Sequence, residues 1–320
     1  MNSVSAVLTC YNEEKYIGDA IGSVVQQTRY DAISEIIVVD DGSEDNSEEV
    51  IREWGDRCGK LHYVYQENQG LPVARNTGIE RSSGDFIALQ DGDDIWLEER
   101  LEHQLCFLSD HPDVGLLYTD VYSFGEGEDG KKRGYCNRYE YGDSDLLRRL
   151  FVEGGSILPS TTLIDNECFR TVGLFDPSLR LGQDTDLWLR IASRYPIQHI
   201  QKPLVLKRQR DQSLGSNVEE KARYLLRVTD KIADLYPELD PLRKGRKAKI
   251  HGGLSRNRLV AGDRLGAVKS ALRAISLDPR TPKHHATLGF ALLPFGVRQL
   301  QWLRKRIQGA KRKIHGWTRS

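Results

Sequence analysis

A run of acidic residues, Gln90-Asp91-Gly92-Asp93-Asp94, is the part of this 320-residue chain whose residue types most directly indicate chemistry. It follows residues 84–89, an apolar segment typical of a buried β-strand. Carboxylates gathered at one strand end repel one another unless a cation lies among them. Because Mn²⁺ and Mg²⁺ prefer oxygen ligands and keep positions free for phosphates, we expect one of these ions to bind here. A solvated acidic turn is the alternative.

The elements that would position this run alternate between strands and helices. Four strands are expected, each followed by an apolar pattern at helical spacing: the strands lie at residues 4–10, 36–39, 61–65 and 85–89, and the last two helices at 72–81 and 97–109. This alternation predicts an α/β fold with a mostly parallel sheet between helices. Such sheets bind ligands beyond the carboxyl ends of their strands. The polar residues at those ends are Thr9, Tyr11, Asp40, Asp41, Asp91, Asp93 and Asp94.

The chain changes character beyond residue 215, where no β pattern is visible. We therefore expect two domains, an α/β domain at 1–215 and an α-helical region with a basic tail at 216–320. Residues 241–277 have the pattern of an αα-hairpin, without a second copy at a fixed period. The expected helical stretches are 217–236, 241–261, 263–277, 283–293 and 297–313.

The net charge of zero hides an uneven distribution. Residues 279–320 hold ten Lys and Arg and no acid, whereas residues 1–278 carry a net charge of −10. Together with Trp302 and Leu303, these cations favour peripheral contact with an anionic membrane surface. A solvated helix end or a protein-docking helix is the alternative, and nothing upstream supports nucleic acid as a partner.

The cysteine content and hydropathy bear on where the protein resides. Five dispersed cysteines without metal-ligand spacing indicate a reducing compartment. No apolar run approaches the roughly 18–20 residues that span a bilayer. We therefore expect a cytoplasmic protein that contacts the inner face of the cell membrane through its tail.

Two further patterns are interpreted as unrelated to function. Gly125-Glu126-Gly127-Glu128-Asp129-Gly130 matches G-x-G-x-x-G, but its three acids would repel phosphate and no helix pattern follows. We interpret it as a flexible acidic loop. His284 and His285 have no partners at metal-ligand spacing and are expected at the surface.

Taken in order, these segments resemble the family 2 glycosyltransferases, and the resemblance covers about 210 residues. It implies the GT-A fold, which is Rossmann-like with a mostly parallel sheet between helices, followed here by a C-terminal helical extension. The five segments that carry it are Val4–Asn12, Ile37–Ser43, Asn68–Asn76, Gly84–Asp94 and the pair Gly173–Asp176 with Gly182–Arg190.

The resemblance implies an inverting hexosyltransferase. We expect it to move a sugar from a nucleotide-sugar donor, which we expect to be UDP-linked, to a saccharide or lipid-linked saccharide in cell-surface polysaccharide or glycoconjugate synthesis. On the donor side, Asp41 would accept a hydrogen bond from the base, although Asp40 and Asp41 could instead cap the next helix. The other donor-binding residues would be Thr9, Tyr11, Asp40, Arg75, Asp91 and Asp93, with Asp93 and Asp94 holding the metal.

On the acceptor side, the resemblance assigns the catalytic base to Asp184. The family usually has Glu-Asp at this position, and this chain has Gln183-Asp184, so the base is retained while a neighbouring charge is lost. Asp186 is a rival candidate, or a helix N-terminal acid. Arg210 stands where the family often has a histidine near the diphosphate; a solvated basic loop is the alternative reading of that segment.

Three other functions remain to be distinguished. A sugar nucleotidyltransferase also uses clustered carboxylates and a metal, but should have a phosphate-binding loop after the first strand, where residues 9–14 read Thr-Cys-Tyr-Asn-Glu-Glu. An NAD-dependent oxidoreductase would need its glycine fingerprint there. A non-catalytic nucleotide-sugar-binding module would bind the donor without turnover, and the presence of Asp184 argues against it.

Overall fold

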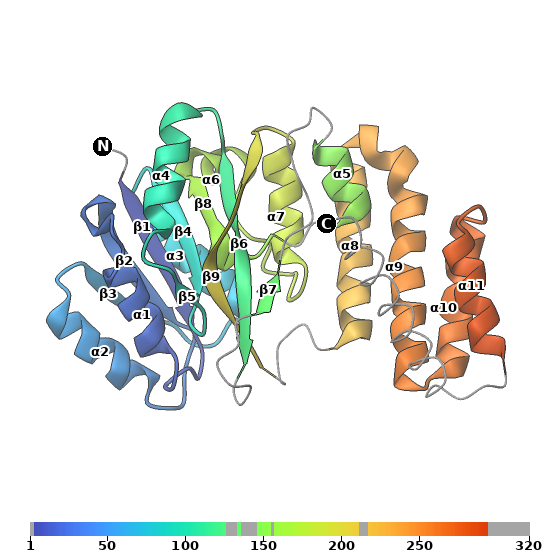
Figure 1. Ribbon diagram of the computed structural model, residues 1–320, viewed down its shortest axis with the longest axis horizontal. Coiled ribbons are helices and arrows are strands. Elements are labelled where there is room, and N and C mark those ends of the chain that lie inside the picture. Colours follow the sequence, from blue (N-terminus) through green and yellow to red (C-terminus); the bar gives the residue numbers. More distant parts are fainter. Residues whose placement is uncertain (1–2, 126–132, 136–145, 155–156, 211–216, 294–320) are drawn as a thin grey trace, which may run out of the picture. The chain divides into compact units, whose positions relative to one another are not determined.

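The structure is a computed structural model that describes residues 3–125, 133–135, 146–154, 157–210 and 217–293. The chain divides into two compact units, Met1–Ser216 (unit 1) and Asn217–Ser320 (unit 2) (Figure 1).

A nine-stranded sheet forms the centre of unit 1, in the order β3-β2-β1-β4-β8-β6-β9-β5 with β7 beside β6. Its first half is parallel, as expected from the alternation of strands and helices. All seven residues of the central strand β1 are buried, which explains its unbroken apolar sequence. The four strands of this half are β1 (Val4–Cys10), β2 (Ile33–Asp40), β3 (Leu61–Tyr65) and β4 (Phe86–Asp91).

The second half of the sheet is mixed, which the sequence pattern did not indicate. β8 runs antiparallel to both β4 and β6, whereas β9 runs parallel to β6 and antiparallel to β5. These strands bring residues far apart in the chain to the end of β4. They are β5 (Ile95–Trp96), β6 (Leu116–Gly125), β7 (Arg133–Tyr135), β8 (Thr162–Asp165) and β9 (Ile197–Gln209).

Helices cover both faces of this sheet (Figure 1). The main core joins β1, β2 and β4 to α1 (Ile17–Val25), α2 (Ser47–Arg57) and α4 (Arg100–Asp110). On the other face, Ala74 of α3 (Leu71–Arg81) packs against β2. The remaining helices of unit 1 are α5 (Leu146–Glu153), α6 (Asn166–Val172) and α7 (Gln183–Ala192), with 3₁₀ turns at Tyr30–Ala32 and Pro159–Thr161.

Unit 2 is α-helical wherever the structure describes it. The expected αα-hairpin is formed by α9 and α10: Gly262 ends α9 with a φ of 89°, and the Asp263 carboxylate caps α10 by accepting from Gly266 N. The expected helix at 297–313 lies outside the described residues, as does the acidic loop after Gly125. The helices are α8 (Val218–Leu235), α9 (Asp240–Ala261), α10 (Arg264–Leu277) and α11 (Pro282–Leu292), with a 3₁₀ turn at Pro237–Leu239.

One expectation about unit 2 is wrong. His284 is only 5% exposed, whereas His285 is at the surface as expected. The His284 imidazole lies against Gly252 of α9 so closely that a Cβ there would be 2.6 Å from the ring. The glycine makes room for the ring, which therefore packs between helices. None of the described helices is long and apolar enough to cross a bilayer.

Candidate functional site

The acidic run lies directly beside the end of β1. Thr9 of β1 pairs with Asp91 of β4, and a Cβ on Gly92 would lie only 2.7 Å from the Thr9 carbonyl oxygen. Glycine is therefore required at position 92 for the run to turn this closely past the sheet edge. As a result, the carboxylates of the run are gathered at the carboxyl end of the central strands.

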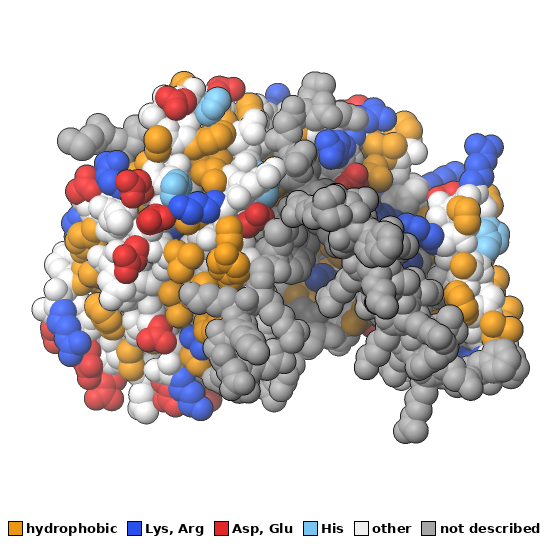
Figure 2. Space-filling model, viewed as in Figure 1, with side chains coloured by type: hydrophobic (Ala, Val, Ile, Leu, Met, Phe, Trp, Pro, Cys, Tyr) orange, Lys and Arg blue, Asp and Glu red, His pale blue; other side chains and the backbone are white. Residues whose placement is uncertain are grey.

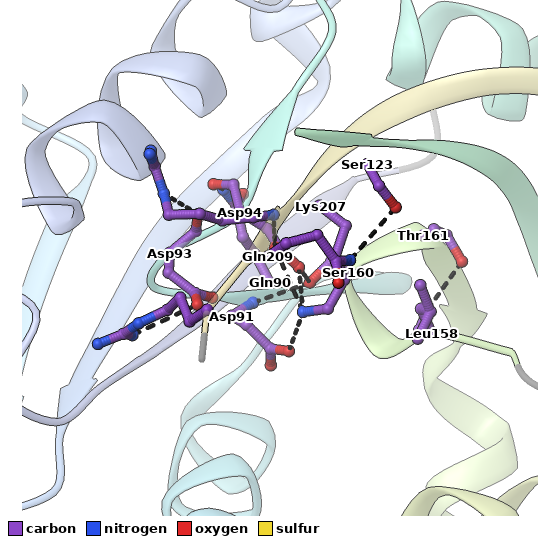
Figure 3. A network of polar contacts seen from close by, with 12 residues as sticks. Gln90, Asp91, Asp93, Asp94, Ser123, Leu158, Ser160, Thr161, Lys207 and Gln209 are labelled. Atoms are coloured by element: carbon purple, nitrogen blue, oxygen red, sulfur yellow. Dashed lines mark hydrogen bonds and ion pairs between the residues drawn. The ribbon is translucent and has the colours of Figure 1, made fainter. Parts of the chain in front are cut away.

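Each carboxylate of the run is paired with a cation of the chain itself. Asp91 Oδ1 accepts from Arg75 at 2.6 Å, and Asp93 lies 3.4 Å from Arg210. Asp94 lies 3.1 Å from Lys207, whose ammonium is also 3.6 Å from Asp91 (Figure 3). The cations come from α3 and from the end of β9 with the residue that follows it, so two segments meet the acidic run at this point.

Lys207 is a functional candidate that the sequence analysis missed. Burial alone would lower its pKa, but the carboxylates of Asp94 and Asp91 raise the pKa above its usual value, so the ammonium stays charged. Burial likewise would raise the pKa of Asp91, but Arg75 and Lys207 hold it below its usual range. The available sequence signal was a lysine immediately after the apolar residues 204–206 of a strand.

The three carboxylates differ in how well they could bind a metal. Asp94 is fully buried, and both of its oxygens are engaged: Ser160 Oγ donates at 2.6 Å, and Lys207 and the Arg208 backbone N–H also contact it. The side chains of Asp91 and Asp93 keep 25% and 16% exposure. The described residues contain no cluster of three His, Cys, Asp or Glu side chains that could hold an ion. An ion here would therefore need phosphate oxygens, and Asp93 with Asp91 fits it better than Asp94 does.

The neighbouring strand end carries Asp40 and Asp41, both buried. Asp40 accepts from the Ser43 backbone N–H and from the Tyr63 hydroxyl, so it holds the turn after β2. Asp41 accepts from Gln66 Nε2 and from the backbone N–H groups of Gln69 and Gly70, which fixes the loop that leads into α3. A carboxylate has about four acceptor positions, so Asp41 can still receive a further hydrogen bond. Of the other donor-side candidates, Thr9 is buried and Tyr11 is 47% exposed.

The loop after β1 closes this side of the site. Asn12 adopts a φ of 55°, which is rare for a residue with a side chain, and its Oδ1 accepts from the Glu44 backbone N–H. Glu13 follows, and burial raises its pKa to about 7, partly offset by a hydrogen bond from Arg210 at 2.5 Å. Arg210 is thus shared between Glu13 and Asp93, with its guanidinium over the Tyr16 ring.

Arg208 is held differently from Arg210. Its side chain is 10% exposed and lies between the rings of Tyr16 and Phe124, and its Nε donates to the Asp93 backbone oxygen. These contacts make Arg208 a support for the acidic run, whereas Arg210 presents a cation at its open side.

The two acceptor-side candidates, Asp184 and Asp186, are held in contrasting ways at the start of α7. Asp184 is partly exposed, and its Oδ1 accepts from the backbone N–H of the next residue, Thr185. Asp186 is completely buried and makes two hydrogen bonds with Arg190, at 2.8 and 3.0 Å. A base must reach a substrate hydroxyl, so the geometry favours Asp184 over Asp186. Gln183, the substituted neighbour, is buried.

The structure therefore brings together most donor-side candidates. Asp91, Asp93 and Asp94 share one cluster with Arg75 and Arg210. Thr9, Tyr11, Asp40 and Asp41 stand at the ends of the two adjacent strands, and Asp184 stands in the first turn of α7.

The known proteins that are similar in sequence to this chain are glycosyltransferases. The model of glycosyl transferase family 2 matches residues 5–173. An uncharacterized glycosyltransferase of Rickettsia conorii is 34% identical over 221 residues, which are 67% of this chain and 35% of that protein. The putative teichuronic acid biosynthesis glycosyltransferase TuaG of Bacillus subtilis is 30% identical over 192 residues, covering 60% of this chain and 72% of TuaG. This chain thus spans about a third of the Rickettsia protein's length.

Two solved structures are similar in fold. S. aureus TarS 1–349 in complex with UDP-GlcNAc has a TM-score of 0.65 at 18% identity, covering 86% of this chain and 81% of that one. The mannosyltransferase PcManGT from Pyrobaculum calidifontis, in complex with GDP-Man and Mn²⁺, has a TM-score of 0.60 at 18% identity, covering 100% of this chain and 88% of that one. These likenesses confirm the expected fold class, an α/β sheet followed by C-terminal helices.

Proposed function

Since the chain belongs to glycosyl transferase family 2, we propose that it is an inverting hexosyltransferase that uses a UDP-linked sugar. The observation that carries this proposal is the cluster of Asp91 and Asp93 with Arg75 and Arg210 at the end of the central strands. It offers both oxygen ligands for a metal and cations for a diphosphate within one polar site.

On the donor side, the roles follow from which groups are partly exposed or keep a free acceptor position. Asp93, with Asp91, would hold Mn²⁺ or Mg²⁺, which supplies Lewis-acid stabilisation of the negative charge on the departing diphosphate. Arg210 is 36% exposed and can turn from Glu13 toward that diphosphate. Asp41, with Thr9 and Tyr11 beside it, would receive the nucleoside. The buried ion pair of Asp94 with Lys207 would hold the run against β9.

On the acceptor side, Asp184 would act as the general base. Its carboxylate would take the proton from the acceptor hydroxyl as that oxygen bonds to the anomeric carbon, on the face opposite the breaking bond to the diphosphate. Asp186 would instead hold the N-terminal turn of α7 rigid through Arg190.

The donor and acceptor classes are proposed from relatives. TarS has been solved with UDP-GlcNAc, and PcManGT with GDP-Man and Mn²⁺, so a nucleotide sugar is the donor class and UDP the nucleotide that we propose. TuaG is named for teichuronic acid biosynthesis, which supports a saccharide or lipid-linked saccharide acceptor in a cell-surface polymer. We further propose a cytoplasmic location with peripheral contact at the inner membrane face through the basic tail.

A panel of nucleotide sugars tests the donor proposal directly. Melting temperatures would be measured with UDP- and GDP-sugars, each with Mn²⁺ and with EDTA. A ligand at 100 times its dissociation constant adds about 2.7 kcal/mol to the free energy of unfolding, which such a measurement detects. We expect a UDP-sugar to stabilise the protein only with the metal, and released UDP to appear when an acceptor is added.

Other outcomes would support other functions. Stabilisation without turnover on any saccharide acceptor would indicate a non-catalytic nucleotide-sugar-binding module. Formation of pyrophosphate from UTP and a sugar phosphate would indicate a sugar nucleotidyltransferase. Stabilisation by GDP-sugars alone would correct the nucleotide while leaving the reaction class in place.

A further inference from the structure

A side chain on the donor-side helix α3 binds the backbone of a segment that precedes α7. Asn76 Nδ2 donates to the Phe175 carbonyl oxygen at 2.8 Å, and Phe175 N–H donates to Asn76 Oδ1 at 2.9 Å. The amide side chain thus satisfies both backbone groups of one residue, as a neighbouring β-strand would. The two residues are 99 positions apart in the chain.

The same segment, residues 172–175, is bound from its other side by α7. Arg190 Nη1 donates to the carbonyl oxygens of Val172 and Gly173 at 2.5 and 3.2 Å, and Nη2 donates to that of Leu174 at 2.7 Å. Asp186 orients this guanidinium with two further hydrogen bonds. Arg190 and Asp186 are both buried, so charge-assisted hydrogen bonds shielded from water hold the segment against α7.

The Phe175 side chain extends this connection to the acidic run. Its ring is 2% exposed and lies edge to face with Trp188 of α7, with centroids 6.1 Å apart. On the other side, the Arg75 guanidinium lies 5.4 Å from the ring centroid, and Arg75 itself binds Asp91. An unbroken series of contacts therefore joins Asp91 to the helix that carries Asp184.

We propose that Asn76 is a positioning residue that sets the place of Asp184 relative to the donor cluster of Arg75 and Asp91. This inference rests on the proposed function, in which Asp184 is the base and the cluster binds the donor. Asn76 contacts neither reactant in this role. It fixes the 172–175 segment to α3, and Arg190 of α7 binds the same segment, so the position of the segment sets the position of α7.

The expected effect follows from how strictly such transfer depends on geometry. The acceptor oxygen must lie in line with the bond to the departing diphosphate, and a misplacement of about 1 Å can cost roughly 100-fold in rate. Donor binding depends on groups on the strand ends and α3, and the Arg75 guanidinium keeps its hydrogen bond to Asp91 when the segment shifts. Loss of the Asn76 bonds should therefore lower kcat while donor affinity stays nearly constant.

The test compares Asn76→Asp with Asn166→Asp. Aspartate at position 76 can still accept from Phe175 N–H, but it replaces the donor Nδ2 with an oxygen facing the Phe175 carbonyl. Asn166 is the matched control: it is also partly buried, and its Nδ2 donates to the Gly84 carbonyl at 2.9 Å at the opposite end of β4. We expect kcat to fall about 10- to 100-fold in Asn76→Asp alone. The dissociation constant for UDP should change less than about 3-fold in both variants, a difference below 1 kcal/mol.

A double-mutant cycle separates positioning from general destabilisation. Arg190→Lys keeps a cation beside Asp186 but cannot reach three carbonyl oxygens. If both residues act through the same segment, the kcat loss of the double variant should be smaller than the product of the two single losses. Independent structural defects at the two sites would instead multiply.

Amide hydrogen exchange of residues 183–187 gives a readout that needs no turnover. We expect faster exchange in Asn76→Asp and wild-type exchange in Asn166→Asp. Equal exchange in the two variants, equal kcat, or a parallel loss of UDP affinity in Asn76→Asp would overturn the inference. If the wild-type protein transfers no sugar, the proposed function fails, and the exchange result still decides whether Asn76 positions the start of α7.

Discussion

The two units of this chain carry net charges that are opposite in sign and equal in size. Residues 1–216 hold 22 Lys and Arg against 38 Asp and Glu, a net charge of −16, and residues 217–320 hold 24 against 8, a net charge of +16. Unit 1 gathers part of its acidic excess at the strand ends and pairs it with cations. Unit 2 instead has an excess of cations and exposes several large apolar side chains, a combination that suits contact with an anionic surface.

The exposed apolar residues follow the same division. Most of the large apolar side chains that are exposed in the described residues belong to unit 2, and Figure 2 shows apolar and cationic side chains on one face of its helices. We propose that unit 1 carries the chemistry and that unit 2 contacts another surface. The exposed apolar residues between positions 260 and 293 are Val260, Leu265, Leu272, Phe290, Leu292 and Leu293.

The largest effect should come from the base in unit 1. Asp184→Asn keeps the shape of the side chain and removes its ability to accept a proton, so kcat should fall by at least about 100-fold. UDP affinity should remain near the wild-type value, because the base contacts the acceptor. Steady-state rates and UDP titrations of the same preparation measure both quantities.

Asp186→Asn is the matched control for that substitution. It leaves the buried Arg190 guanidinium without its carboxylate, so its main effect should be a lower melting temperature. Severe loss of kcat in Asp186→Asn with full activity in Asp184→Asn would show that the base had been misassigned between these two carboxylates.

The next effect concerns Asp93 and Asp94, the last two carboxylates of the acidic run. Asp93→Asn should weaken Mn²⁺-dependent UDP binding by roughly 10-fold or more with little change in melting temperature, since Asp93 is partly exposed. Asp94→Asn should instead lower the melting temperature, because the buried Lys207 ammonium loses its nearest carboxylate. Isothermal titration with Mn²⁺ and with EDTA, followed by thermal melts, separates the two. Unchanged UDP binding in Asp93→Asn would remove it from the metal site.

How much of unit 1 could be predicted depends on the range of the interactions involved. Strands β1 to β4 were evident because each is a short apolar run ending in polar residues. The mixed half of the sheet was not, because the partners of β8 and β9 are set by pairings between distant segments. Lys207 meets Asp94 across 113 positions and Asn76 meets Phe175 across 99, and no local pattern records such distances.

Unit 2 shows the same limit from another side. Helical spacing identified α8 to α11 within a few residues of their bounds. The burial of His284 could not be predicted from helical spacing. It depends on Gly252 having no side chain, and a hydrophobic pattern reports only the side chains that a helix carries. The resemblance named the candidate residues of unit 1, but their relative accessibility, which favours Asp184 over Asp186, required the packing of α7.

A smaller effect in unit 1 should depend on pH. The pKa of Glu13 is raised to about 7 in the folded chain, so between about pH 4.5 and 7 the unfolded chain releases this proton first. The free energy of unfolding should therefore fall as the pH rises through this window, and Glu13→Gln should remove that contribution. In EDTA and without nucleotide, the melting temperature of Glu13→Gln relative to wild type should rise from pH 5 to pH 8. A constant difference would mean that Glu13 is not held in its neutral form.

The smallest effect tests unit 2. We predict that the full-length chain co-sediments with vesicles containing anionic lipid at low salt and is released at high salt. Cations close to such a surface contribute about 1 kcal/mol each, and ten lie between residues 279 and 320. A chain truncated before Pro294 should bind much less, while transfer to a soluble acceptor persists. Equal sedimentation of both lengths would remove the tail from the interaction.

A pair of leucines distinguishes a membrane-facing surface from exposed apolar residues in general. Leu272 on α10 and Leu235 on α8 are both 51% exposed. Leu272 shares its face of α10 with Leu265 and Lys269, whereas Leu235 follows Asp234. Leu272→Glu should reduce vesicle binding several-fold, because it places an anion where the cations approach the lipid, and Leu235→Glu should leave binding unchanged. Light scattering would show whether Leu272→Glu instead changes only the oligomeric state. In that case this face of α10 would contact a second copy of the chain. Membrane attachment of unit 2 would then depend on its tail alone.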